Sequence, residues 1–302
     1  MENLWSIIAS EAFWHSVIRV TTPVLFAAMA AIISQQAGVI NISLEGTMLV
    51  SALIGVLASA ATQNAWIGLL AAALTGVLYA LILAYFSLSL KTDITLCGIA
   101  LNLLASGGTI FLLYLVTGDK GSSAAMKSMV APTVNIPLLQ DIPAIGSILS
   151  GHNLLTYLAV ICVAVVSFLL YKTPTGLRIR SVGEYPNAAS SVGVSVLKVQ
   201  YTALMASGLL AGLGGAFMSM GYLSWFSKDM VAGRGFVALA ACAMGQGRPL
   251  GTLIASFAFG TADAISNYLQ VMQISPEFVM MIPYLAAVIG MIAYSIKKFR
   301  RN

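Results

Sequence analysis

Long uncharged stretches alternate with short charged segments along the chain. Because a bilayer core tolerates few charges and a spanning helix needs about 20 residues, this pattern predicts membrane-spanning helices. We expect nine of them, near residues 14–34, 45–62, 66–89, 94–117, 153–171, 200–226, 233–247, 249–270 and 277–297. The seventh is short and contains Arg234, which favours a tilted or partly re-entrant helix. Residues 4–18 form a mixed amphipathic segment that either lies at the membrane interface or belongs to a tenth span.

Composition supports an all-α polytopic membrane protein and excludes other classes. Of 302 residues, 59% are hydrophobic and 8% are charged, against about 25% charged in soluble domains. This excludes a soluble enzyme, a disordered protein and a nucleic-acid binder. Cys97, Cys162 and Cys242 have no paired spacing and read as apolar helix residues. His15 and His152 lie far apart, and no cluster has the spacing of a metal site, so we expect no metal.

The distribution of Lys and Arg predicts the orientation in the membrane. If the loop at 172–199 is cytoplasmic, alternating spans give one side ten Lys and Arg residues: Lys91, Lys172, Arg178, Arg180, Lys198, Arg248, Lys297, Lys298, Arg300 and Arg301. The other side has four: Lys120, Lys127, Lys228 and Arg234. The C-terminus is therefore expected in the cytoplasm. Nine spans put the N-terminus outside, whereas a tenth at 4–18 would put it inside.

Two long loops interrupt a single transmembrane domain that we expect to cover residues 1–302. The external loop, 118–152, contains three prolines and is expected to form an irregular cap or short helices. The internal loop, 172–199, has Pro186 and Gly193 at positions that suit the start and the end of a short helix at about 186–192. We expect this helix to lie along the membrane face.

Motifs for chemistry are missing from the sequence. No Gly-Lys dipeptide occurs, so there is no Walker A phosphate loop. Gly208, Gly212, Gly214 and Gly215 lie in an uncharged helix and favour close helix packing over a dinucleotide loop. We therefore expect neither catalytic residues nor a cofactor.

Polar residues inside the predicted spans are functional candidates by default. Glu45 begins a span, where Asn41 and Ser43 are placed to cap the helix whose first turn contains it. Asp263 lies towards the outer end of its span, where pairing within the bundle is the favoured interpretation. Asn102 lies in the middle of a span and either contacts a polar solute or bonds a neighbouring helix.

Four blocks of sequence, in order along the chain, resemble a known family. They are 37–48 (AGVINISLEGTM), 183–194 (GEYPNAASSVGV), 207–216 (SGLLAGLGGA) and 235–251, which begins GFVALA. Together they resemble the permease subunits of ABC importers for ribose-type sugars and nucleosides. Asn41 makes the first block more similar to the nucleoside branch, because the ribose branch usually has Asp there.

The resemblance implies a type II ABC importer permease bundle of about nine to ten transmembrane helices in the cytoplasmic membrane of a prokaryote. It implies a separate ABC ATPase, a second permease subunit that is a different paralogue, and an extracytoplasmic solute-binding protein. A coupling helix for the ATPase would contain Gly183, Glu184, Pro186, Asn187, Ala188, Ala189 and Gly193. The translocation pathway would include Asn41, Glu45, Asn102 and Phe236. We expect nucleoside import. A sugar permease is the alternative, and a secondary transporter is less favoured.

Overall fold

The computed structural model describes residues 10–135 and 145–271, with four single positions at 285, 288, 290 and 292. The long helices are α2 (Glu11–Gln36), α3 (Leu44–Thr62), α4 (Ala65–Ala84), α5 (Ile94–Thr117), α8 (Leu154–Lys172), α11 (Val196–Phe217) and α13 (Pro249–Val271). The short helices are α7 (Ile145–Leu149), α9 (Pro174–Glu184), α10 (Pro186–Ser191) and α12 (Arg234–Met244). Single π turns, η1 (Tyr85–Ser89) and η2 (Met218–Tyr222), extend α4 and α11. Strands β1 (Thr133–Val134) and β2 (His152–Asn153) pair antiparallel.

Six of the helices in the described part of the chain are long and apolar enough to cross a membrane. They are α2, α3, α4 with η1, α5, α8, and α11 with η2, and they match the first six predicted spans. As expected, α12 is short, with 11 residues. The predicted span 249–270 coincides with the 23-residue α13, although α13 is not among these six. The ninth predicted span, 277–297, lies outside the described ranges. Residues 11–18 of the amphipathic segment are the start of α2.

Polar residues begin several of these helices as their sequences suggest. Asn64, Asp93 and Asn153 each accept hydrogen bonds from backbone N–H groups in the first turn of α4, α5 and α8. Thr173 does the same for α9, whose first residue is Pro174. These side chains satisfy N–H groups that have no partner within the helix, and so they fix where each helix starts.

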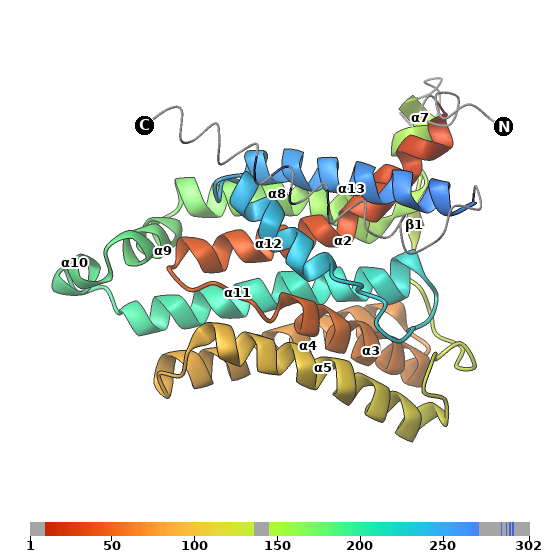
Figure 1. Ribbon diagram of the computed structural model, residues 1–302, viewed down its shortest axis with the longest axis horizontal. Helices are drawn as coiled ribbons and strands as arrows, with labels where there is room; N and C mark the ends of the chain where they lie inside the picture. The colour runs from red at the N-terminus through yellow and green to blue at the C-terminus, as the bar shows by residue number, and fades with distance from the viewer. Residues whose placement is uncertain are drawn as a thin grey trace.

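The helices run roughly parallel along the long axis of the molecule, with α2 and α11 in the middle (Figure 1). Helices α3, α4 and α5 lie on one side of this pair, and α8 and α13 lie on the other. Gly76 of α4 and Gly208 of α11 face each other so closely that a Cβ on either would overlap backbone of the other. The predicted packing role of the glycines in α11 is confirmed.

Short elements cover the two ends of the bundle. Helices α9 and α10 lie at one end, and α7 lies at the other with the start of α2 (Figure 1). Ser147 donates a hydrogen bond to the Glu11 carboxylate at 2.5 Å, which joins α7 to α2. The loop 118–152 contains the expected short helix, and it also contains β1 and β2, which the sequence did not predict.

Two connections enter the bundle instead of staying at its ends (Figure 1). Residues 37–43 run inward from the α9 end, and α3 begins only at Leu44. Residues 223–233 run inward from the opposite end, and α12 begins at Arg234. Irregular backbone is tolerated at membrane depth only where protein or water satisfies it. Accordingly, Ala37, Asn41 and Ser43 are fully buried.

Candidate functional site

Glu45 links the two connections that enter the bundle, which we call the re-entrant connections: residues 37–43 and residues 223–233. Its two carboxylate oxygens accept hydrogen bonds from the backbone N–H of Gly233 at 2.7 Å and of Gly235 at 2.8 Å. These N–H groups lie at the start of α12, where the helix dipole favours a negative charge. Gly235 has no space for a side chain, because a Cβ would lie 2.6 Å from the Glu45 nitrogen. The carboxylate in the first turn of α3 therefore fixes the start of α12.

Asn41 is a fully buried structural link between the first re-entrant connection and α11. Its Nδ2 donates to Ser207 Oγ at 3.0 Å, and its Oδ1 accepts from the backbone N–H and the hydroxyl of Ser43. The predicted capping of α3 by Asn41 and Ser43 is wrong. Ser43 is the N-cap residue but makes no capping bond with its side chain, because its hydroxyl is committed to Asn41. A pathway role for Asn41 stays a prediction.

Asn102 bonds a neighbouring helix, which was one of its two predicted alternatives. Its Oδ1 accepts from the backbone N–H of Gly46 at 2.8 Å, and its Nδ2 donates to the Ile42 carbonyl at 2.9 Å. From α5, Asn102 therefore bonds to Ile42 and Gly46, which lie just before and just after the first residue of α3. The side chain is half-buried, so contact with a solute remains a prediction.

The first connection also contacts the loop at the end of the bundle. Gly38, at φ +77°, packs against Gly183 near the end of α9, and a Cβ on Gly38 would lie 3.1 Å from the Gly183 Cα. A Cβ on Gly183 would overlap the carbonyl oxygen of Gln36. The Gln36 side chain donates to the Gly247 carbonyl at 3.0 Å, in the turn between α12 and α13. The end of α9, the end of α2 and the turn after α12 are thus in contact with one another.

Helix α10 presents an exposed surface at this end of the molecule. Of its residues, only Ala189 is buried. The flanking Tyr185 and Val192 are 70% and 79% exposed. Glu184, Pro186, Asn187, Ala188 and Gly193 are exposed as well, whereas Gly183 is half-buried. The predicted coupling segment is therefore available for a partner.

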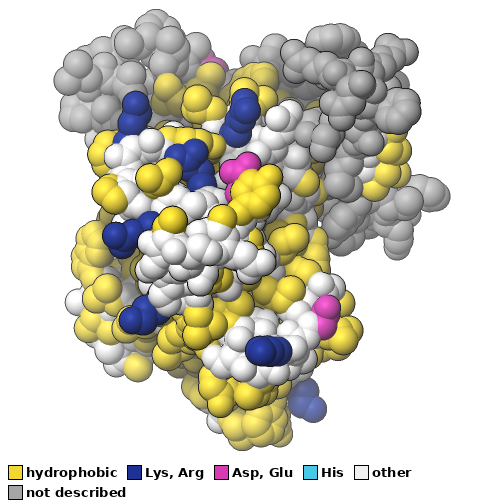
Figure 2. Space-filling model, turned by 90° about the vertical axis from the view of Figure 1, so that its left-hand side faces the viewer, with side chains coloured by type: hydrophobic (Ala, Val, Ile, Leu, Met, Phe, Trp, Pro, Cys, Tyr) yellow, Lys and Arg dark blue, Asp and Glu magenta, His cyan; other side chains and the backbone are white. Residues whose placement is uncertain are grey.

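The end that carries α9 and α10 is basic. Figure 2 shows Lys and Arg side chains spread over it, with fewer Asp and Glu side chains. This agrees with the excess of Lys and Arg that the sequence assigns to one side of the membrane.

Arg234 and Asp263 form an ion pair with an N–O distance of 3.1 Å, between the start of α12 and α13. Arg234 also donates to the carbonyls of Met230 and Val231, so its charge is committed. The structural interpretation of Asp263 is confirmed. Phe236, in the first turn of α12, is 48% exposed.

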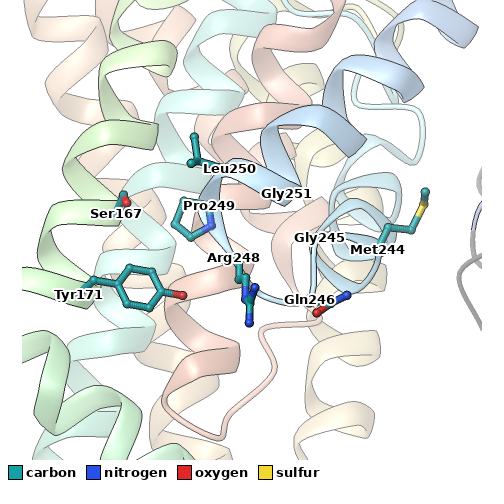
Figure 3. A pocket seen from close by; sticks show the side chains of 9 residues that line it. All are labelled: Ser167, Tyr171, Met244, Gly245, Gln246, Arg248, Pro249, Leu250 and Gly251. Carbon is teal, nitrogen blue, oxygen red and sulfur yellow. The ribbon is translucent and has the colours of Figure 1, made fainter. Parts of the chain in front are cut away.

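A pocket of about 690 Å³ opens between α8 and the turn from α12 to α13 (Figure 3). Tyr171 and Ser167 line it from α8, and Arg248 lines it from the turn. None of the predicted pathway or coupling residues lines this pocket. We call the contacts of residues 37–46 with α5, α9, α11 and α12 the junction. The junction is therefore separate from this pocket.

Contacts of the junction bring together all four sequence blocks. The first block meets the second at Gly38 and Gly183, the third at Asn41 and Ser207, and the fourth at Glu45 and Gly235. The sequence order of the blocks did not reveal these pairings. Sequence reasoning also missed the role of Gln36, because an isolated polar residue near a span end gives no signal, and it missed the exposed Asp229, which lies in a connection between predicted spans.

Comparison with known proteins identifies relatives over most of the chain. NupQ of Bacillus subtilis, a guanosine ABC transporter permease protein, is 36% identical over 283 residues, which are 90% of this chain and 88% of NupQ. NupC of Lactococcus lactis, a nucleoside ABC transporter permease protein, is 31% identical over 89% of this chain and 87% of NupC. TsgC13 of Haloferax volcanii, named for glucose, is 34% identical over 83% of this chain and 75% of TsgC13. The two bacteria each contribute a second relative, NupP and NupB.

A solved ABC transporter in an inward-facing conformation shares the fold, with a TM-score of 0.52 and 17% identity. The likeness covers 93% of this chain and 85% of that one. A family model described as the permease component of the branched-chain amino acid transport system matches residues 14–291. The chain therefore belongs to this permease family and is a permease subunit of an ABC importer.

Proposed function

We propose that this chain is a permease for nucleosides, in the cytoplasmic membrane of a prokaryote with its C-terminus in the cytoplasm. The observation that carries this proposal is the 36% identity to the guanosine permease protein NupQ over 90% of this chain. An uncharged solute needs little fixed charge along its path, and the charges of Arg234 and Asp263 neutralise each other. That feature suits sugars equally, so the substrate class rests on the relatives.

ATP hydrolysis is assigned to a separate ATPase that binds α10 and its flanking residues. The exposure of Ala188, Tyr185 and Val192 supports this docking surface. A partner drives a conformational change only if it binds two conformations with different affinities. Movement of α10 would reach the first re-entrant connection through Gly183 and Gly38, and would reach α12 through Glu45.

Two further partners belong to the proposal. A second permease, related but different, is supported by the pairs NupP with NupQ and NupB with NupC. A solute-binding protein would dock at the opposite end, where β1, β2 and α7 lie.

A sugar permease is the second candidate, and the likeness to TsgC13 favours it. A secondary transporter would need free carboxylates for ion coupling. Glu45 and Asp263, the two carboxylates that the sequence offered for that role, do not suit it, because both are bonded within the bundle.

Uptake by whole cells tests the proposal. The gene for this chain is deleted in its host, and uptake of radiolabelled guanosine, cytidine, ribose and glucose is measured with and without a plasmid copy. We expect loss and recovery of nucleoside uptake alone. Loss of ribose or glucose uptake with unchanged nucleoside uptake would overturn the substrate assignment and favour the sugar permease.

A further inference from the structure

Asp229 is a carboxylate at mid-depth in the bundle, and it is exposed. Its Oδ1 accepts a hydrogen bond from Ser106 Oγ at 3.2 Å. Ser106 is the thirteenth of the 24 residues of α5, a helix that crosses the membrane. At a rise of 1.5 Å per residue, Ser106 lies about 18 Å from the first residue of α5. The carboxylate therefore lies near the middle of the bilayer.

The position of Asp229 is fixed by the junction. Its carbonyl accepts from the Ala232 nitrogen at 3.0 Å in a tight turn, and Gly233 follows with its N–H bound by Glu45. The one ion pair in the described part of the chain joins Arg234 to Asp263, so no described cation pairs with Asp229. The ordered backbone of this turn thus holds the Asp229 carboxylate at mid-depth in the bundle, although no described cation pairs with it.

The surface beside Asp229 is open in the described structure. A Cβ at Gly107, the residue after Ser106, would meet nothing within 4 Å, so this position of α5 has no neighbour in the described structure. Phe236, in the first turn of α12, exposes an aromatic side chain. An ionised carboxylate facing lipid chains is expensive, and charged residues within spans almost always face a cavity with water or another bundle element. The surface with Asp229 and Ser106 is thus unsuited to lipid.

We propose that Asp229 faces the water-filled translocation pathway and binds the ribose hydroxyl groups of the nucleoside, while Phe236 offers a ring for the base. A carboxylate accepts two hydrogen bonds from a vicinal diol, and Ser106 orients it by donating to the other side. This inference rests on the proposed function for its ligand. The location of Asp229 in the pathway stands on the geometry alone.

Labelling of introduced cysteines tests the location. Asp229→Cys and Ser106→Cys are each made in a background without the three native cysteines, and the complete importer is reconstituted in liposomes. A charged thiol reagent that does not cross membranes is added from the side of the solute-binding protein. The matched control is Leu104→Cys, on the same helix, about 200° round from Ser106 and 61% exposed in this chain.

We expect labelling at positions 229 and 106 but not at 104, and at least a threefold slower rate with saturating guanosine and binding protein. Position 106 keeps the test valid if the substitution at Asp229 prevents assembly. Lack of labelling at both positions overturns the pathway location and indicates cover by the second permease or by lipid. Equal labelling at 104 also overturns it, because water would then reach α5 on the face opposite Ser106 as well, and the side of Asp229 would not be special.

Uptake by Asp229→Asn tests the ligand. We expect the KM for a ribonucleoside to rise about tenfold, as for loss of a charged hydrogen bond, and the KM for its 2′,3′-dideoxy analogue to stay within twofold. Asp119→Asn, an exposed carboxylate beyond the end of α5, is the control and should change neither value. Equal changes for both solutes would overturn the diol assignment. If the unsubstituted importer takes up no nucleoside, the proposed function and this ligand both fail, while the labelling result still decides the location.

Discussion

Glu45→Gln removes the charge that binds the start of α12 and keeps the size of the side chain. One oxygen remains to accept from Gly233 or Gly235, but the new NH₂ group faces the other N–H. A hydrogen bond to a charged group contributes about 1.5–3 kcal/mol, and a carboxylate at a helix N-terminus adds about 0.3–1 kcal/mol. We therefore expect Glu45→Gln to destabilise the junction by roughly 2–4 kcal/mol.

Thermal unfolding of the purified complex in detergent, followed by uptake into liposomes, measures this effect. A loss of 1 kcal/mol lowers the midpoint by about 2 °C in a large chain, so we expect a fall of about 4–8 °C. Uptake should fall with it, because α12 is no longer held in one position. Asp119→Asn, which loses an exposed carboxylate bonded to the Gly121 N–H, is the control. An unchanged midpoint together with unchanged uptake in Glu45→Gln would refute the role of the carboxylate.

Four further predictions concern other parts of the structure. Gly183→Ala should abolish transport, because its Cβ would overlap the Gln36 carbonyl. Ala188→Trp, at an exposed position of α10, should leave the permease folded but uncouple ATP hydrolysis from uptake. ATPase and uptake assays check both predictions. Gly208→Leu should prevent stable expression where Gly107→Leu does not, measured by detergent gel filtration. Burial lowers the pKa of His152, and the charges of His15 and Arg19 lower it further, whereas the hydrogen bond to the Ile148 carbonyl raises it. The unfolded chain then takes up the proton first as the pH falls below about 6.5, so acid should destabilise wild type more than His152→Gln in thermal melts at pH 7.5 and 5.5.

The spans follow from the sequence because charge and hydropathy act locally. Asp93 and Asn153 mark helix starts by bonding N–H groups two or three residues away, and such signals are visible in a short window. The start of α3 inside the bundle is different. Residues 37–43 are as uncharged as the helices beside them, and the contacts that hold this irregular segment, such as Gly38 with Gly183 and Asn41 with Ser207, join distant parts of the chain.

For the candidate site, likewise, the sequence predicts some of the residues but not the contacts that they make. Asn41, Glu45 and Asn102 were selected because polar groups inside a membrane are costly unless they have a partner or a task. Their partners include the Ser207 side chain and the backbone N–H groups of Gly46 and Gly235, which lie 56 to 190 residues away along the chain. No periodicity in a single sequence encodes such pairings. Asp229 was missed because it lies in a short connection with other charged residues, and only its bond to Ser106 reveals its depth.

ATP-driven uptake of nucleoside tests the central claim most directly. The complete importer, with its ATPase and second permease, is reconstituted in liposomes that contain ATP, and radiolabelled guanosine is added outside with the solute-binding protein. We predict accumulation that stops when ATP is replaced by a non-hydrolysable analogue and that excess unlabelled nucleoside, but not ribose or glucose, competes away. Accumulation of glucose or ribose without guanosine, or guanosine uptake that is independent of ATP, would contradict the account.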